Sequence, residues 1–536
     1  MENLLLLGDE AIAHGGIDAG ISGIYAYPGT PSTEIMEYVQ NSERTANRNI
    51  FCKWSANEKT AFEAALGMSY AGKRAMVCMK HVGLNVAADP FMNASITGIN
   101  GGMVIVVADD PSMHSSQNEQ DSRFYGKFAL IPVLEPSNQQ EAYDMTVYGF
   151  VLSEKYNIPV MLRLTTRLAH SRAPVKPGNI TNQKNLTLPS DSSQFILLPS
   201  IARKRYRGLL SVQADLETES ENSGYNRLFD GKNKSVGIIA CGLAYNYLIE
   251  NYKDGMPDNP VLKVGQYPLP MKLIRKIIGD CDRLLVLEDG YPLVEEMLRG
   301  FNEGDGRISG RLDGSLPRDG ELNPDHVAKA AGFKVTEGPA VPELVRNRPP
   351  SLCVGCGHID MYNALLDAIG IYGKGRVFSD IGCYTLGALE PFNAINSCVD
   401  MGASITMAKG ASDAGLHPSV CVIGDSTFTH SGMTGLLDVV NDNSPVTVII
   451  GDNSITGMTG GQKSSATGRI EEICRGIGVE PSHIRLITPL KKNHDENVAV
   501  LAEELAYKGV SVIIARRECI QTAVKRKKVK KSSNQV

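Results

Sequence analysis

One stretch, residues 420–462, constrains the fold of this 536-residue chain more than any other. It begins within one apolar run, 419–423, and takes in a second, 446–450, and the two runs are separated by a spacer of helical length. Short apolar runs are typical of strands buried on both faces, and a helical connection between them is typical of a parallel sheet. The chain is therefore expected to be an α/β protein built on parallel sheets.

Polar residues follow both of these predicted strands. Gly424, Asp425 and Ser426 come after the first strand, and Asn453 comes after the second. Because the carboxyl ends of parallel strands meet at one edge of a sheet, Asp425 and Asn453 could bind Mg²⁺ with the backbone carbonyl of Ile455. Ser426 would open a helix whose amides face a diphosphate. Turn residues between buried strands could explain the Gly-Asp-Ser triplet alone, but the matching asparagine favours a site for thiamine diphosphate with Mg²⁺.

Composition and charge restrict the class of protein. Hydrophobic residues make up 42% of the chain and charged residues 21%, as in an ordinary globular protein. The net charge is −5, so the chain lacks the excess of basic residues that is typical of nucleic-acid-binding proteins. The leucines at 4–7 follow an acidic residue and lack the basic flank of a signal peptide. No apolar run approaches the roughly 20 residues of a membrane span. We expect a cytoplasmic protein that binds no nucleic acid and spans no membrane.

The pattern of apolar runs and polar segments divides the chain into several parts, as expected for its length. Alternating strands and helices predict α/β domains, and polar or Pro/Gly-rich stretches predict the connections. The lysine-rich end is expected to be a solvated tail, with an anionic partner as the alternative. The predicted parts are an α/β domain at 1–185, a connecting segment at 186–234, a smaller α/β domain at 235–335, a linker at 336–348, an α/β domain at 349–520 and the basic tail at 521–536.

Cysteines indicate a second kind of site in the last domain. The chain has eleven cysteines and no secretory signal, so a clustered subset is expected to bind a metal rather than to form disulfides. Cys353 and Cys356 have C-x-x-C spacing, and Cys383 follows a predicted strand. Thiolates in this pattern suit a tetrahedral zinc or an iron–sulfur cluster. The fourth ligand could be Cys398, Cys421, Cys474 or Cys519, of which Cys421 is the least convenient because it lies inside a strand.

Glu58 is the candidate catalytic residue of the first domain. It lies in a helical run at 55–70 that is rich in small residues. A single helical glutamate is usually a solvated side chain, but thiamine needs a carboxylate at N1′ of its aminopyrimidine ring. If Glu58 has that role, the cofactor spans two domains.

The sequence resembles a known family over nearly its whole length. It is similar to the alpha subunit of indolepyruvate:ferredoxin oxidoreductase, within the 2-oxoacid:ferredoxin oxidoreductase superfamily. The segments that carry the resemblance are 27–32 (YPGTPS), 57–59 (NEK), 79–90, 114–123, 380–387 (DIGCYTLG), 424–426 (GDS) and 458–462 (MTGGQ).

The resemblance implies a fold and a set of site residues. The fold has two thiamine-diphosphate-binding domains, of pyrimidine-binding and diphosphate-binding type, flanking a smaller domain like the transketolase carboxy-terminal domain. Glu58 is implied as the thiamine-activating residue, and Thr30 and Arg123 as the residues that position the substrate carboxylate. The family pattern also implies a [4Fe–4S] cluster and selects its fourth ligand, because the last family cysteine falls late in the domain. The implied cluster ligands are Cys353, Cys356, Cys383 and Cys519, and further cofactor contacts are expected at Gly382, Cys383, Gly424, Asp425, Ser426, Asn453, Ile455, Met458 and Thr459.

The activity implied by the resemblance is oxidative decarboxylation of an aryl 2-oxoacid such as indolepyruvate. The acyl group passes to coenzyme A and the electrons pass through the cluster to ferredoxin. The implied partner is a smaller beta (gamma-type) subunit, in a dimer of heterodimers. The family commonly carries a carboxy-terminal ferredoxin-like domain where this chain has its basic tail, so we expect an external ferredoxin or ferredoxin-like subunit. The alternatives are a non-oxidative thiamine-dependent decarboxylase or carboligase, and a non-catalytic subunit.

Overall fold

The chain forms two compact units, Met1–Pro339 and Ala340–Val536, which are described here separately. The structure is a computed structural model. It describes residues 3–533 except 192, 253–256, 301–306, 336–337, 339–341, 346–349 and 399. Most of the linker predicted at 336–348 therefore lies outside the described residues, as do the side chains of 527–533 in the basic tail.

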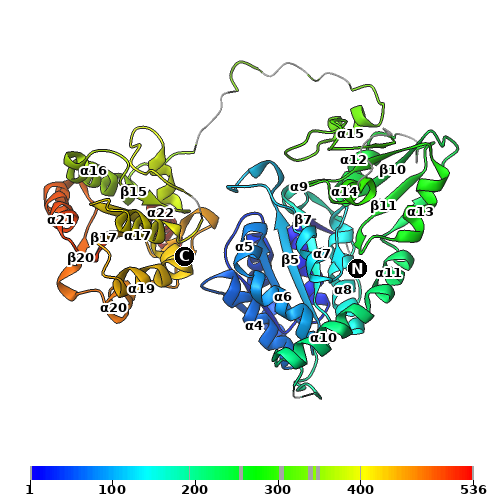
Figure 1. Ribbon diagram of the computed structural model, residues 1–536, viewed down its shortest axis with the longest axis horizontal. Coiled ribbons are helices and arrows are strands. Elements are labelled where there is room, and N and C mark those ends of the chain that lie inside the picture. The colour runs from blue at the N-terminus through cyan, green and yellow to red at the C-terminus, as the bar shows by residue number, and fades with distance from the viewer. Residues whose placement is uncertain are drawn as a thin grey trace. The chain divides into compact units, whose positions relative to one another are not determined.

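The first unit is built on a seven-stranded sheet with the order β12-β6-β7-β5-β4-β2-β3. Strands β5 and β7 of this sheet are labelled in Figure 1. The strands of the sheet run parallel except for β12, which is antiparallel to β6. Helix α4 packs on β2 and β4, and α8 packs on β5 and β7. The elements are β2 (Gly23–Ala26), β3 (Phe51–Trp54), α4 (Glu58–Tyr70), β4 (Ala75–Lys80), β5 (Met103–Asp109), β6 (Val133–Leu134), α8 (Gln139–Tyr156), β7 (Val160–Thr165) and β12 (Gln266–Tyr267).

A second, five-stranded sheet in the same unit has the order β14-β13-β10-β11-β9. Only β9 is antiparallel to its neighbour. The short strand β12 belongs to the smaller domain by sequence, yet it pairs with β6 of the first sheet. The two predicted domains of this unit therefore share a sheet. The elements are α10 (Pro199–Ser211), α11 (Gln213–Asn222), β9 (Arg227–Phe229), β10 (Val236–Cys241), α12 (Leu243–Ile249), β11 (Val261–Val264), α13 (Met271–Asp280), β13 (Arg283–Leu287), α14 (Leu293–Arg299) and β14 (Ile308–Ser309).

The second unit is built on a five-stranded parallel sheet with the order β15-β16-β17-β21-β20. Its central strands are buried along their whole length, as their apolar runs predict. A small antiparallel hairpin, β18 with β19, follows β17. The elements are α16 (Gly357–Ile369), β15 (Val377–Ser379), α17 (Ala403–Asp413), β16 (Ser419–Gly424), α18 (Asp425–Thr427), α19 (Met433–Asn441), β17 (Val446–Asp452), β18 (Ile455–Thr456), β19 (Gln462–Lys463), α20 (Ile470–Ile477), β20 (Ile484–Ile487), α21 (His494–Ala506), β21 (Ser511–Arg516) and α22 (Ile520–Ser533).

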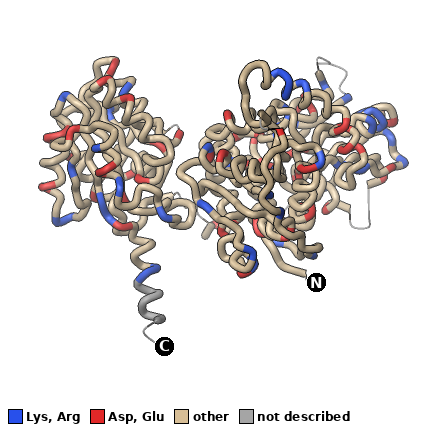
Figure 2. Tube along the Cα trace, turned by 90° about the horizontal axis from the view of Figure 1, so that it is seen from below, with Lys and Arg blue, Asp and Glu red and all other residues tan. Residues whose placement is uncertain are grey.

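These sheets confirm the predicted fold class, an α/β protein with parallel sheets. Lysine, arginine and acidic residues are interspersed over both units (Figure 2). Among the described helices, none is both long enough and apolar enough to cross a membrane.

Candidate functional site

Two acidic side chains meet at one edge of the sheet in the second unit. Gly424, the last residue of β16, lies opposite Gly451 of β17, so Asp425 and Asp452 come close together where the strands end. Asp425 is 2% exposed, and its Oδ2 has no hydrogen-bond partner among the described residues. The same holds, within the described part of the chain, for Oδ1 of Asp452. Orphaned carboxylate oxygens in a buried position suit a hard divalent cation, so Asp425 fits its predicted role as an Mg²⁺ ligand. Asp452 was not predicted as a ligand, although its side chain lies at the same edge.

The charge on this edge is not balanced by the protein alone. Burial and the neighbouring Asp452 raise the pKa of Asp425 to about 7. Arg516 donates from Nε to Oδ2 of Asp452 at 2.7 Å, and the amide of Ser426 donates to Oδ1 of Asp425 at 2.8 Å. A cation bound here would hold both carboxylates ionised.

The hairpin after β17 carries the other predicted cofactor contacts. Oδ1 of Asn453 accepts the amide of Ile455 at 3.1 Å, which fixes the turn into β18. The hydroxyls of Ser426 and Thr456 are 2.8 Å apart, so the hairpin and the helix start are linked. The hairpin tip holds Met458 and Thr459 in a short helical turn. Residues Asp425, Ser426, Asn453 and Ile455 are thus brought to one edge of the sheet, as their spacing predicts.

The helix that begins at Asp425 is irregular. Segment α18 passes into a π-helical turn, Phe428–Gly432, before α19 continues regularly. Single π-turns inside helices occur often at functional sites. No sequence pattern predicted this turn, and the helix starts at Asp425, one residue earlier than predicted.

Tyr384 packs between the two glycine loops that face this edge. A Cβ added to Gly382 would lie 2.3 Å from the Tyr384 ring, and one added to Gly424 would lie 2.7 Å from it. The Tyr384 hydroxyl donates to Asp380, whose pKa burial raises to about 6. Glycine is therefore required at both positions by the close approach of this ring.

Four cysteine side chains line one cavity of about 90 Å³ in the second unit. They come from the loop before α16, from the turn after β15 and from the residue before α22. Asp452 and Asn453 line the same cavity, so the thiols lie beside the predicted diphosphate edge. Burial, with the other three thiols, raises the pKa of Cys383 to about 11. The four residues are Cys353, Cys356, Cys383 and Cys519.

Polar groups contact two of these thiols. Nε2 of Gln521 donates to Sγ of Cys353 at 3.4 Å. Nδ1 of His358 lies 3.5 Å from Sγ of Cys356. Burial lowers the pKa of His358 to about 4, so the ring is neutral at physiological pH. His358 and Gln521 are residues of this site that sequence reasoning missed, because a single His or Gln beside a cysteine is not a motif.

The other three cysteines proposed as a fourth ligand lie elsewhere. Cys398 is exposed, and its Sγ is 3.8 Å from the carbonyl oxygen of Asp380. Cys421 is buried in β16, and Cys474 is buried in α20. Within the described part of the chain none of the three lines the cavity. The convergence of thiols therefore favours Cys519, which the sequence selected only through the family resemblance.

Glu58 is a buried residue at the start of α4 in the first unit. Asn57 caps the helix by accepting the amide of Thr60 at 2.9 Å. Glu58 is only 6% exposed. A Cβ added to Gly83 would lie 2.5 Å from its Oε1, so α5 (His81–Val86) approaches the carboxylate closely. Glu58 is therefore unlike most single glutamates on helices, whose side chains are exposed to solvent.

Lys80, at the end of β4, is linked to Thr30 through Ser115. It is 8% exposed, and Nζ donates to the carbonyl oxygen of Ser115 at 2.6 Å. The Ser115 hydroxyl in turn donates to the carbonyl oxygen of Thr30 at 3.0 Å. Burial lowers the pKa of Lys80 to about 8, although Asp110, 4.0 Å away, opposes the shift. Sequence reasoning did not single out Lys80.

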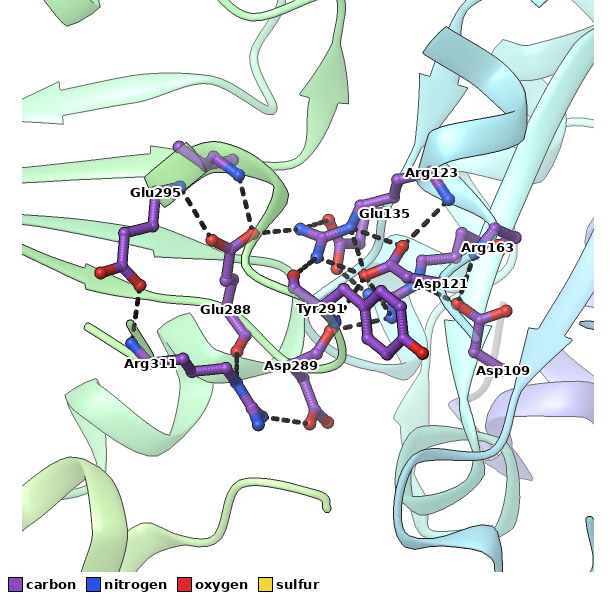
Figure 3. A network of polar contacts seen from close by, with 12 residues as sticks. Asp109, Asp121, Arg123, Glu135, Arg163, Glu288, Asp289, Tyr291, Glu295 and Arg311 are labelled. Atoms are coloured by element: carbon purple, nitrogen blue, oxygen red, sulfur yellow. Dashed lines mark hydrogen bonds and ion pairs between the residues drawn. The ribbon is translucent and has the colours of Figure 1, made fainter. Parts of the chain in front are cut away.

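Arg123 does not fit the role that the resemblance implied for it. Its guanidinium is fully buried and is held by groups of the protein (Figure 3). Nη2 donates to Asp121 at 2.5 Å and to the carbonyl oxygen of Tyr291 at 2.8 Å. Nη1 is 3.0 Å from Glu288 and donates to the Tyr267 hydroxyl at 3.1 Å. With its donors occupied and no exposed surface, Arg123 ties the smaller domain to the first sheet and is not placed to meet a substrate carboxylate.

Comparisons with known proteins agree with this geometry. Residues 14–195 match the family model for pyruvate flavodoxin/ferredoxin oxidoreductase, thiamine diphosphate-binding. Residues 380–528 match the carboxy-terminal TPP-binding domain of thiamine pyrophosphate enzymes. Together, fold and site define the class: the chain has the binding domains of a thiamine-diphosphate-dependent enzyme.

Similarity to individual proteins is more specific. The chain is 40% identical to indolepyruvate oxidoreductase subunit IorA of Archaeoglobus fulgidus, over 97% of this chain and 86% of that protein. It is 38% identical to the IorA subunit of Pyrococcus abyssi, with the same coverage. A solved 2-oxoglutarate:ferredoxin oxidoreductase from Magnetococcus marinus matches with a TM-score of 0.48 and 18% identity, over 58% of this chain and 62% of that chain. The chain belongs to the family of indolepyruvate oxidoreductase subunit IorA.

Proposed function

We propose that this chain is the thiamine-binding subunit of an enzyme that oxidatively decarboxylates an aryl 2-oxoacid such as indolepyruvate to an acyl-CoA. Electrons leave through a [4Fe–4S] cluster held by Cys353, Cys356, Cys383 and Cys519. The observation that carries this proposal is the convergence of these thiols on one cavity, which Asp452 and Asn453 also line. A non-oxidative decarboxylase would have no use for four thiols beside its cofactor.

The residues of the chain bind and orient the cofactor. In the second unit, Asp425, Asn453 and the carbonyl oxygen of Ile455 would hold Mg²⁺ and the diphosphate. In the first unit, Glu58 would hold the aminopyrimidine of a thiamine diphosphate at N1′. Thiamine diphosphate, when bound, supplies the carbanion and the electron sink for decarboxylation. The buried position of Glu58 keeps water from its carboxylate, which strengthens its hydrogen bond to the cofactor.

Lys80 and Thr30 face the carboxylate of the 2-oxoacid in this proposal, in place of the predicted Arg123. Replacing Lys80 by methionine should raise the KM for the 2-oxoacid roughly 10- to 100-fold, because a charge-assisted hydrogen bond contributes about 1.5–3 kcal/mol. The affinity for thiamine diphosphate should stay unchanged. Steady-state kinetics check this result, with Lys53→Met, an exposed lysine of β3, as the matched control. An unchanged KM in Lys80→Met would remove Lys80 from the substrate site.

Binding of Mg²⁺ by the chain should weaken as the pH falls through about 7. The pKa of Asp425 is raised to about 7, so the carboxylate is ionised above that pH and carries a proton below it. Since Mg²⁺ and the proton compete for the same group, the affinity should fall about tenfold per pH unit well below 7. Calorimetric titration of Mg²⁺ in the presence of thiamine diphosphate measures this dependence. Asp425→Asn should bind weakly at every pH, and a pH-dependent affinity that survives in this variant would locate the titrating group elsewhere.

The assembly follows from the family. The relatives are named as subunits, and we propose a smaller beta (gamma-type) subunit in a cytoplasmic dimer of heterodimers, with coenzyme A as co-substrate. A ferredoxin or ferredoxin-like subunit outside this chain accepts the electrons.

An anaerobic assay of the complex with its small subunit tests the reaction. We expect acyl-CoA to form only when coenzyme A and an electron acceptor are both present. Aldehyde release at the same rate without an acceptor would identify a non-oxidative decarboxylase instead.

A further inference from the structure

A group of side chains in the first unit has no part in the function proposed above. Asp9 on α1 (Gly8–Asp18), Glu34 on α2 (Thr33–Asn41) and His170 at the end of α9 (Thr166–His170) each offer one ligand atom, and these atoms lie within 4.8 Å of one another. Nε2 of His170 is 3.7 Å from Oε2 of Glu34. Three helices that are distant in sequence thus converge on one point.

Asp9 is the unusual member of this group. It is 0% exposed, and neither of its carboxylate oxygens has a hydrogen-bond partner in the described part of the chain. Oε2 of Glu34, which faces the same point, also has no such partner among the described residues. An ionised carboxylate buried without a partner is strongly disfavoured, so a cation or a proton must compensate it.

We propose that Asp9, Glu34 and His170 bind a divalent transition-metal ion. Two carboxylate oxygens with one imidazole nitrogen suit Mn²⁺, Fe²⁺ or Zn²⁺, whose ligand atoms stand about 3–4 Å apart. The side chains of Glu34 and His170 are 37% and 36% exposed, so an ion can enter from solvent and these two side chains can close on it. Water completes the coordination.

The position of the site indicates its effect. Helix α2 follows directly after the segment 28–32, which carries Thr30, and α9 follows directly after β7. An ion at this point ties α2 to α1 and α9, and so fixes the helix that follows the Thr30 segment. The alternative is a proton on Asp9 shared with Glu34, which needs no metal.

Mn²⁺ is the probe, because it prefers carboxylate and imidazole to the thiolates of the second unit. The full-length chain, stripped of metal by a chelator and free of thiamine diphosphate, is titrated while electron paramagnetic resonance measures free Mn²⁺. All samples carry Asp425→Asn, which removes the other carboxylate site. Glu34→Gln and His170→Ala are compared with Glu43→Gln, an exposed glutamate on α3 (Glu43–Asn47).

We expect the parent and Glu43→Gln to bind one equivalent of Mn²⁺ more than either ligand variant. Mn²⁺ should also raise the Tm of the first two proteins and not of the others, because only a folded site binds the ion. His170 lies at the surface, so its replacement leaves the packing of the unit intact and keeps the comparison valid. Equal stoichiometry in all four proteins would overturn the proposal and leave Asp9 as a protonated acid.

Discussion

Replacing Cys519 by alanine is expected to remove the proposed [4Fe–4S] cluster and to lower oxidative activity at least about 100-fold, since that cluster would lose one of its four proposed thiolate ligands. The variant should lose the broad visible absorption of the anaerobically purified protein and the EPR signal of the reduced cluster. Its affinity for thiamine diphosphate should change little, because Asp425 and Asn453 remain in place.

The matched control is Cys398→Ala. Cys398 is an exposed thiol of the same unit and, within the described part of the chain, does not line the four-cysteine cavity. This variant should keep its iron, its acid-labile sulfide and its activity. The assignment of ligands is wrong if Cys519→Ala retains a full cluster or if Cys398→Ala loses it.

Replacing Glu58 by glutamine is expected to lower kcat by about 10²–10⁴, the usual contribution of a positioned acid–base group. Glutamine keeps the size of the side chain, but its amide cannot accept and release a proton as the carboxylate does. Steady-state assay of the complex measures kcat, and calorimetric titration measures cofactor binding, which should persist through the Mg²⁺ ligands. We therefore expect the substitution to lower kcat and to leave cofactor binding in place.

Glu63→Gln is the control for this second experiment, because Glu63 lies on the same helix α4 and is exposed. It should be as active as the parent. Parental activity in Glu58→Gln would instead support a non-catalytic role for this chain.

Much of the fold could be predicted because its central strands are short, fully apolar runs. The runs at 419–423 and 446–450 became β16 and β17. Strand β7 was missed, since Arg163 stands in its middle and breaks the apolar pattern. In the structure Arg163 is buried, and its Nε donates to Oδ2 of Asp109 at 2.7 Å. Because Asp109 is distant in the sequence, no local pattern around Arg163 predicts that its charge is neutralised.

The candidate site shows the same limit. Asp425 and Asn453 could be placed together because parallel strands bring their carboxyl ends to one edge. The fourth cluster ligand could be chosen among the four candidate cysteines only from the family pattern or from the structure. The spacing of cysteines in the sequence does not predict which distant thiol lines the cavity. Arg123 shows the converse: its position in a motif suggested substrate binding, whereas its carboxylate partners could be known only from the fold.

The pairing of β12 with β6 has a consequence for how such chains can evolve. Arg163 lies on β7 of the first sheet and Arg123 begins helix α7 (Arg123–Ala129), while Glu288 and the carbonyl oxygen of Asp289 that they contact come from the smaller domain (Figure 3). A gene break between the two domains would leave buried charges without partners and an open sheet edge on β6. Recombination must therefore carry the two halves of the first unit together.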